Sequence, residues 1–308
     1  MRVLTHPACR EHHNGPGHPE RPERLDAVLE ALEAMEGLTF ENPMAAAESD
    51  LQRAHTPELI AFLQKHVPDH GIYPIDGETL LSPGSWKAAL HASGAGLSGL
   101  RVLLEEDTHE SVFCAVRPPG HHAEADQAFG FCLFNNAAIA AASAQDIYGL
   151  ERVAIVDFDV HHGNGTDSFA RARDGLFYAS THQMPLFPGT GTPSAADRQN
   201  NIYNIPGEAG DGSEAFRSAY KEKIFPALAD FRPELLILSA GFDAHANDPL
   251  AHIDLNGGDF EWVTKELRRV CKSADCSKTL SFLEGGYDLE GLKDGVRGHL
   301  EGLKAKLG

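Results

Sequence analysis

The sequence predicts an α/β fold in which helices cover both faces of a central parallel sheet. Its expected strands are short apolar runs without polar alternation, such as residues 153–156 and 235–238, and segments of helical periodicity separate them. Strands that are buried on both faces lack alternation, and parallel strands need crossover helices between them. The 308 residues contain no linker, repeat or low-complexity tract, so we expect a single domain over residues 1–308.

One strand and three helices are expected in the first hundred residues. Residues 2–5 form the strand. Pro22 begins a helix whose apolar side chains recur every 3.6 positions. Thr56 caps the next helix, which has Pro57 in its first turn. The third helix spans residues 86–104, and its central glycines lower its helix propensity, which indicates that it is buried against other helices.

Strands and helices are expected to alternate through the rest of the chain. The strands are expected at residues 111–116, 153–156, 176–180, 235–238 and 279–283. The helices are expected at residues 137–144, 216–231 and 260–271 and at the C-terminal end. In parallel sheets of this kind, ligands bind beyond the carboxyl ends of the strands.

The composition limits the possible partners. A formal net charge of −19 argues against direct contact with nucleic acid, because such binding needs Lys and Arg to neutralise phosphates. Five cysteines without a C-x-x-C pair are expected to be reduced and mostly buried. The N-terminus lacks an apolar leader, and no apolar run reaches about 20 residues, which predicts a cytoplasmic protein without membrane contact. The oligomeric state is not predicted.

The segment from Asp157 to Gly165 is the most informative motif in the chain. It directly follows an apolar strand, and side chains two positions apart on extended backbone point the same way. Asp159 and His161 can therefore converge on one point while Asp157 lies behind them. A carboxylate and an imidazole so placed make half of a metal chelate. By itself, the segment is equally well explained as a solvated loop.

Polar residues follow four of the expected strands, which favours one functional site over four unrelated loops. They lie at residues 117–122, 157–165, 239–243 and 284–287. Asp159, His161 and Asp243 would supply three metal ligands and leave a fourth position open. This is the arrangement of a catalytic zinc, although two carboxylates and one imidazole also suit iron(II). A metal there would activate water and polarise a carbonyl.

Three further side chains are candidates for the chemistry. His121 and His122 offer a general base and acid, a role worth ~10²–10⁴-fold in rate, although an isolated histidine pair is more often structural. Tyr287 lies on a Gly-Gly turn and could donate its hydroxyl to a developing oxyanion.

Nearly the whole chain resembles the histone deacetylase family, which are zinc amidohydrolases with the arginase/deacetylase fold. The combination of motifs is highly specific. The matching residues are 18–22, His55, 117–122, 130–132, 157–165, 187–189, 241–249 and 285–287. The resemblance implies a zinc-dependent lysine deacetylase-like hydrolase that cleaves linear amide C–N bonds.

The resemblance also implies roles at the metal site. Asp159, His161 and Asp243 match the zinc ligands, and Tyr287 matches the hydroxyl that polarises the carbonyl. The family binds potassium beneath the zinc, through positions that match Asp157, Asp159, His161, Ser180 and Thr181. Residues 165–169 are one residue shorter than the usual segment, which leaves a second potassium site open.

For the histidine pair, the resemblance implies that His122 is the general base and His121 its electrostatic partner. Asp157 matches the carboxylate behind His121. Asn164 stands where the class I pattern has an aspartate, and it resembles the class II pattern instead. A neutral partner should leave His122 less strongly biased toward its charged form, as a base at neutral pH requires.

The resemblance further implies a narrow channel for an acyl-lysine stem. The matching residues are Gly130, Phe131 and Phe187, with Gly285 and Gly286 beside them. For any single Phe, the core is the more common location. Leu250 occupies the rim position at which polyamine-selective relatives carry glutamate. An apolar side chain gives a cationic polyamine no partner, so an acyl-lysine peptide or protein is the expected substrate.

Three alternatives stay open from the sequence. An acetylpolyamine amidohydrolase would use the same chemistry on a small N-acyl amine. A binuclear manganese ureohydrolase would also use an Asp-x-His motif, but it has no role for the histidine pair and Tyr287. A non-catalytic acyl-amine sensor would be expected to lack the base, the tyrosine or a metal ligand, and all of these are present. The acyl-chain preference and the metal used in the cell are not predicted.

Overall fold

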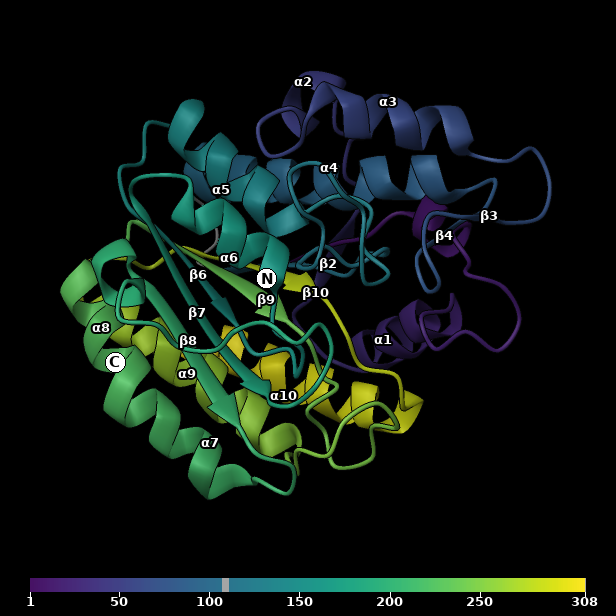
Figure 1. Cartoon of the computed structure of the whole chain (residues 1–308). Coiled ribbons are helices and arrows are strands. Elements are labelled where there is room, and N and C mark those ends of the chain that lie inside the picture. Colours follow the sequence, from purple (N-terminus) through teal and green to yellow (C-terminus); the bar gives the residue numbers. More distant parts are fainter. Residues whose placement is uncertain (107–110, 308) are drawn as a thin grey trace.

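Eight parallel strands form one sheet at the centre of the protein (Figure 1). The computed structural model describes residues 1–106 and 111–307. The strand order is β2-β1-β5-β10-β9-β6-β7-β8. The strands are β1 (Arg2–Leu4), β2 (Thr39–Glu41), β5 (Ser111–Cys114), β6 (Val153–Asp157), β7 (Leu176–Gln183), β8 (Ile202–Gly207), β9 (Leu235–Ala240) and β10 (Thr279–Leu283). A separate hairpin joins β3 (Tyr73–Pro74) to β4 (Leu80–Leu81).

Helices cover both faces of this sheet, as the sequence predicts. On one face α4 packs on α5, and on the other α10 packs on α9 and α1 (Figure 1). The helices are α1 (Glu23–Glu33), α2 (Glu48–Leu51), α3 (Pro57–His66), α4 (Ser85–Leu104), α5 (Asn136–Asp146), α6 (Asn164–Arg171), α7 (Ser213–Ala219), α8 (Phe225–Phe231), α9 (Gly257–Ser273) and α10 (Leu289–Lys304). None of the helices in the described part of the chain is long and apolar enough to cross a membrane.

Two successive residues of β10 contact the helices on opposite faces of the sheet. The hydroxyl of Ser281 lies 2.8 Å from Nε2 of His299 on α10. The next side chain, Phe282, points the other way, and a Cβ added at Gly96 of α4 would lie 2.7 Å from its ring. Alternate residues of a strand face opposite sides of a sheet, so both faces are packed. Gly96 therefore permits close contact between α4 and β10, as the burial predicted from the glycines of this helix requires.

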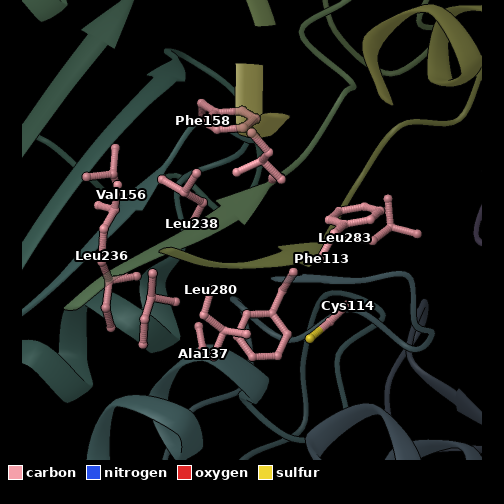
Figure 2. Close-up of a cluster of buried hydrophobic side chains, with 14 of the residues drawn as sticks. Phe113, Cys114, Ala137, Val156, Phe158, Leu236, Leu238, Leu280 and Leu283 are labelled. Carbon is pink, nitrogen blue, oxygen red and sulfur yellow. The ribbon is translucent and has the colours of Figure 1, made fainter. Parts of the chain in front are cut away.

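The hydrophobic core is continuous across the central strands. Figure 2 shows side chains of β5, β6, β9 and β10 gathered with Ala137 of α5. Phe113, Val156, Leu236 and Leu280 are completely buried. Burying a side chain of this size contributes roughly 1.5–3 kcal/mol, which makes these strands a rigid platform. The five cysteines are also buried and free, as expected.

The predicted elements are present, with several differences in detail. The strand expected at residues 111–116 ends at Cys114, and the one expected at 176–180 continues to Gln183. The helix expected at 216–231 is three successive pieces, because a π-helical turn, η3 (Tyr220–Ile224), separates α7 from α8. The edge strands β2 and β8 and the helix α6 were not predicted.

The topology places four functional strand ends next to one another. β5, β10, β9 and β6 are consecutive neighbours in the sheet. All of them run parallel, so the segments after their carboxyl ends share one edge. These are the four segments in which the sequence places its candidate site residues.

Candidate active site

Asp159, His161 and Asp243 converge beyond this edge of the sheet. One ligand atom from each residue lies within 4.8 Å of the other two, and all three side chains are buried. Nδ1 of His161 lies 3.2 Å from Oδ1 of Asp159 and 3.0 Å from Oδ2 of Asp243. Within residues 1–106 and 111–307, this is the only cluster of three or more His, Cys, Asp or Glu side chains with such geometry. A single metal ion therefore fits the arrangement better than a binuclear centre.

Backbone groups hold the two carboxylates in place. The amide of Val160 donates to Oδ1 of Asp243 over 2.8 Å, and the amide of Gly285 donates to Oδ2 of Asp159 over 2.8 Å. A Cβ at Gly241 would lie only 2.1 Å from Oδ2 of Asp159, so the chain can approach this closely only at a glycine. The carboxylates are thereby oriented before any ligand binds.

The electrostatics of the three donors fit a divalent cation. Burial and the charge of Asp159 raise the pKa of Asp243 to about 7. Burial alone would lower the pKa of His161, but hydrogen bonds to Asp159 and Asp243 raise it to about 10. A divalent cation would offset the repulsion between the carboxylates and displace the proton from Nδ1 of His161. Two carboxylates and one imidazole suit zinc or iron(II).

His121 lies next to this cluster, and its ring is hydrogen-bonded to a carboxylate. Its Nδ1 lies 3.0 Å from Oδ2 of Asp157, which also accepts the hydroxyl of Tyr178 over 3.2 Å. Burial opposes a charge on His121, yet Asp159 and Asp157 raise its pKa well above the usual value. Asp157 lies behind the first histidine, where the sequence places it.

His122 lies beside His121, but its hydrogen-bond partner is a neutral amide. Its Nδ1 lies 2.8 Å from Oδ1 of Asn164, at the start of α6. Burial lowers the pKa of His122 well below its usual value, and the charges of His121 and His161 lower it further. The surroundings therefore shift the pKa values of the two adjacent imidazoles in opposite directions, which is a suitable arrangement for one proton acceptor and one cation.

Tyr287 is presented by a tight turn after β10. Gly286 has a φ of 120°, which a residue with a side chain rarely adopts. The amide of Tyr287 donates to Oδ2 of Asp248 over 2.7 Å, and Oδ1 of Asp248 accepts the amide of Leu250 over 3.0 Å. Asp248 therefore ties the candidate catalytic tyrosine to the candidate rim residue.

A cavity of about 340 Å³ leads to this cluster. The side chains of Phe131 and Phe187 form its walls. The ring centres of Phe131 and Tyr287 are 5.9 Å apart, and the two rings are edge-on to each other. Its lining includes His122, Gly130, Phe131, His161, Phe187, Leu250 and Tyr287 of the candidate site residues. Stacked and edge-on aromatic rings suit an alkyl stem. The cavity is lined mainly by apolar groups and carries few polar ones, as small-ligand sites usually do.

The remaining candidate residues do not line this cavity. Gly285 and Gly286, which were predicted to lie beside the channel, precede Tyr287 in the turn and are not among the residues that line the cavity. Asp157 of β6 and Ser180 of β7 are direct partners in the parallel register. The hydroxyl of Ser180 lies 2.9 Å from Nδ1 of His182, and that of Thr181 lies 3.2 Å from the hydroxyl of Tyr220.

A buried ionic network supports the site and was not assigned in the sequence. Oε2 of Glu20 accepts Arg117 over 2.6 Å, and Oε1 accepts Arg24 over 3.0 Å. Arg24 also donates to the carbonyls of Glu284 and Gly286, each over 2.6 Å. All of these side chains are fully buried. The motif at residues 18–22 carries Glu20, but nothing in the sequence pairs it with residues 97 positions away.

Glu284 is a second residue that the sequence did not assign. Its Oε2 accepts the amides of Gly120 and His121, over 2.7 and 3.2 Å. Burial raises the pKa of Glu284 to about 7. Its position directly after a buried strand was a usable signal, because ionisable side chains are rarely buried without a role.

Comparisons with known proteins show which proteins this chain resembles. Residues 18–303 match the family model of the histone deacetylase domain. Histone deacetylase 14, chloroplastic, of Arabidopsis thaliana is 36% identical over 273 residues, which cover 84% of this chain and 64% of that protein. The polyamine deacetylase HDAC10 of Mus musculus is 33% identical over 265 residues, which cover 82% of this chain and 39% of that protein.

A solved structure shows the same fold. The crystal structure of the HDA15 HD domain superposes with a TM-score of 0.90 and 31% identity, covering 99% of this chain and 91% of that one. The parallel sheet and the helices on both of its faces are thus those of a known fold. The chain belongs to the histone deacetylase family, and hence to a family of deacetylases and amidohydrolases.

Proposed function

We propose that residues 1–308 form one catalytic domain that hydrolyses the acyl amide of acetyl-lysine in peptides or proteins, using zinc. The observation that carries the proposal is the convergence of Asp159, His161 and Asp243 at a cavity that His122 and Tyr287 also line. Membership of the deacetylase family supports the reaction class, and that family is generally zinc-dependent.

Asp159, His161 and Asp243 would hold the zinc, each through one side-chain atom. When bound, zinc would activate water and polarise the substrate carbonyl. Tyr287 would donate its hydroxyl to the carbonyl oxygen as negative charge develops there. Burial raises the pKa of this hydroxyl well above its usual value, which keeps it protonated and able to donate. Such a donor is worth about 10²–10³-fold in turnover.

The histidine pair would move the protons. His122 is the better acceptor, because its lowered pKa favours the uncharged ring, which lines the cavity and has only its Nδ1 bonded to Asn164. His121, held charged by Asp159 and Asp157, would act as its electrostatic partner. After the carbonyl is attacked, a histidine must return a proton to the departing nitrogen, so that a free amine and a carboxylate leave the site.

The cavity favours an acyl-lysine over an acetylpolyamine. Phe131 and Phe187 would enclose the lysine stem, and Leu250 itself gives a second ammonium group no carboxylate partner. The lining does contain one carboxylate residue, the exposed Glu78. An acetylpolyamine is the second candidate substrate, because a relative that is named a polyamine deacetylase shares 33% identity.

We also propose a potassium site beneath the zinc site, formed by Asp157, Asp159, His161, Ser180 and Thr181. The adjacent positions of Asp157 and Ser180 on β6 and β7 support it. A monovalent cation there would offset part of the buried negative charge.

The proposed function is tested with zinc-loaded protein and a panel of N-acyl-lysine peptides and acetylpolyamines. Hydrolysis of acetyl-lysine peptides that is lost in Asp243→Ala would support it. Absence of hydrolysis across the whole panel, with zinc bound at the site, would contradict the reaction. Faster turnover of acetylputrescine than of any peptide would instead favour the polyamine substrate.

A further inference from the structure

We propose that Glu124 is a positioning residue that sets the tautomer of His122 by holding the side-chain amide of Asn164 in one orientation. The three side chains form a relay, with Nδ1 of His122 2.8 Å from Oδ1 of Asn164 and Nδ2 of Asn164 2.7 Å from Oε1 of Glu124. The inference rests on the proposed function, because a tautomer matters only if His122 acts as the base.

An asparagine has two ends of opposite hydrogen-bonding character, so its orientation must be determined by its neighbours. Nδ2 of Asn164 faces two acceptors, the carboxylate of Glu124 at 2.7 Å and the carbonyl of His122 at 3.3 Å. If the side-chain amide of Asn164 were flipped, Oδ1 would face both acceptors, and no hydrogen would be available for a bond to either of them. The bond to Glu124 is the shorter one, and a charged acceptor roughly doubles the strength of a hydrogen bond.

The orientation of Asn164 decides where His122 carries its proton. Oδ1 of Asn164 can only accept, so Nδ1 of His122 must be the nitrogen that donates. In an uncharged imidazole, Nε2 then has a free lone pair, and Nε2 is the nitrogen of this cavity-lining ring that Asn164 does not occupy. A general base needs that lone pair. With the amide reversed, Nδ1 would have to accept, and Nε2 would carry a hydrogen that prevents proton abstraction.

An aspartate in place of Asn164 would not need such a partner. Both of its oxygens accept, so it would bind the Nδ1 hydrogen of His122 in either orientation. A neighbouring Glu124 would then be unfavourable, because two carboxylates would lie in contact. With Asn at position 164, the relay therefore needs a hydrogen-bond acceptor at position 124. With Asp at position 164, a carboxylate at position 124 is unfavourable.

The backbone of Glu124 is firmly held, although its side chain is only half-buried. Its carbonyl lies 2.9 Å from Nδ1 of His55, and Nε2 of His55 accepts the amide of Asn135 over 2.8 Å. Burial lowers the pKa of His55 to about 4, which favours an uncharged ring between the backbone groups of Glu124 and Asn135. A second cavity, of about 250 Å³, is lined by Glu124 and Asn164, which leaves room for a longer side chain at position 124.

The test is a set of variants at positions 124 and 164. Glu124→Gln can turn its own amide to accept from Asn164, so turnover should stay within about 2-fold of wild type. Glu124→Lys offers only donors and should reverse the Asn164 amide, lowering kcat by ~10-fold or more with little change in KM. With Asn164→Asp in the same chain, Glu124→Lys should no longer lower kcat, because either oxygen of the aspartate accepts the Nδ1 hydrogen of His122. Asp126→Lys, an exposed acid on the same loop without a bond to Asn164, is the matched control and should behave as wild type.

The tautomer itself is measured by nitrogen NMR of the imidazole rings, which distinguishes a protonated Nδ1 from a protonated Nε2. We expect the Nδ1–H form of His122 in wild type and Glu124→Gln, and the Nε2–H form in Glu124→Lys. This readout does not depend on activity, so it remains decisive if the acyl-amide substrate is wrong. Equal turnover of Glu124→Lys and Asp126→Lys, or an unchanged His122 tautomer in Glu124→Lys, would overturn the proposal.

Discussion

The guanidinium carbon of Arg24 lies 4.9 Å from the centre of the Tyr287 ring, and both side chains are buried. This contact joins the first helix of the chain to the turn after the last strand. Arg24 also donates to the carbonyl of Gly286, directly before the tyrosine. The position of the Tyr287 hydroxyl thus depends on a residue that does not itself line the cavity.

Replacing Arg24 by Met should therefore lower both turnover and stability. The variant keeps much of the side-chain volume but removes the donors to Glu284 and Gly286, and it leaves Glu20 with one fewer cation. Breaking a buried pair in this way costs about 3–5 kcal/mol. Urea unfolding and kcat measurements check both effects. Arg21→Met, on the exposed side of the same segment, is the control and should change neither quantity; an equal effect there would refute the role of Arg24.

Tyr287→Phe isolates the hydroxyl group from the rest of the ring. Turnover should fall by about 10²–10³-fold while KM changes little, because the hydroxyl acts mainly on the charge that develops during the reaction. Steady-state kinetics with an acetyl-lysine peptide measure this directly. Tyr148→Phe removes a hydroxyl that bonds to Glu105 far from the cavity and should be neutral. If both variants kept full turnover, Tyr287 would have no catalytic role.

Leu250→Glu should shift the substrate preference toward acetylpolyamines. A carboxylate at the rim would attract the distal ammonium group, and about 1.4 kcal/mol of such attraction corresponds to a tenfold change. The measurement is the ratio of kcat/KM for acetylputrescine to that for an acetyl-lysine peptide. Leu250→Gln controls for the loss of the apolar side chain. Equal ratios in the Glu and Gln variants would show that charge at this position does not select the substrate.

Acid should destabilise the protein through its buried histidines. Burial lowers the pKa of His299 to about 3, and the charge of Arg268 acts in the same direction. The unfolded chain binds this proton near pH 6.5, so the contribution is fully present above pH 6.5 and is lost as the pH falls toward 3. At about 1.4 kcal/mol per pH unit, roughly 2 kcal/mol is lost between pH 6.5 and 5.

Urea unfolding of wild type and His299→Gln at pH 7 and pH 5 measures this contribution. The glutamine does not titrate, so the stability gap between the two proteins should narrow by about 2 kcal/mol at pH 5. His70→Gln, at an exposed loop position, should show no such narrowing. A gap that is the same at both pH values would contradict the assignment to His299.

The sequence predicted the central part of the fold, and for the same physical reason it predicted that the candidate ligands Asp159 and Asp243 follow strands that end at one edge of the sheet. Buried parallel strands are recognisable as unbroken apolar runs, and their carboxyl ends must share one edge. Asp159 and Asp243 are 84 residues apart, yet Asp159 lies three residues and Asp243 five residues after the end of such a run. The edge strands β2 and β8 carry exposed and intermediate positions, so they lack the apolar signal and were missed.

Two of the supporting residues, Arg24 and Glu124, could not be found in the sequence. Arg24 and Glu124 act through partners that are distant along the chain, and neither belongs to a periodic pattern. Asn164 was found, but the direction in which its amide points depends on Glu124 and on the carbonyl of His122. Such orientations are set by tertiary contacts, which neither propensity nor spacing encodes.

The central claim is that one divalent ion sits among Asp159, His161 and Asp243 and supports amide hydrolysis. The most direct measurement strips the protein with a chelator and titrates zinc back while following metal content and hydrolysis of an acetyl-lysine peptide. We expect activity to rise in proportion to zinc, to reach its maximum at about one ion per chain, and to stay absent in Asp243→Ala. Full hydrolysis by the stripped protein, or a requirement for two manganese ions per chain, would contradict the claim.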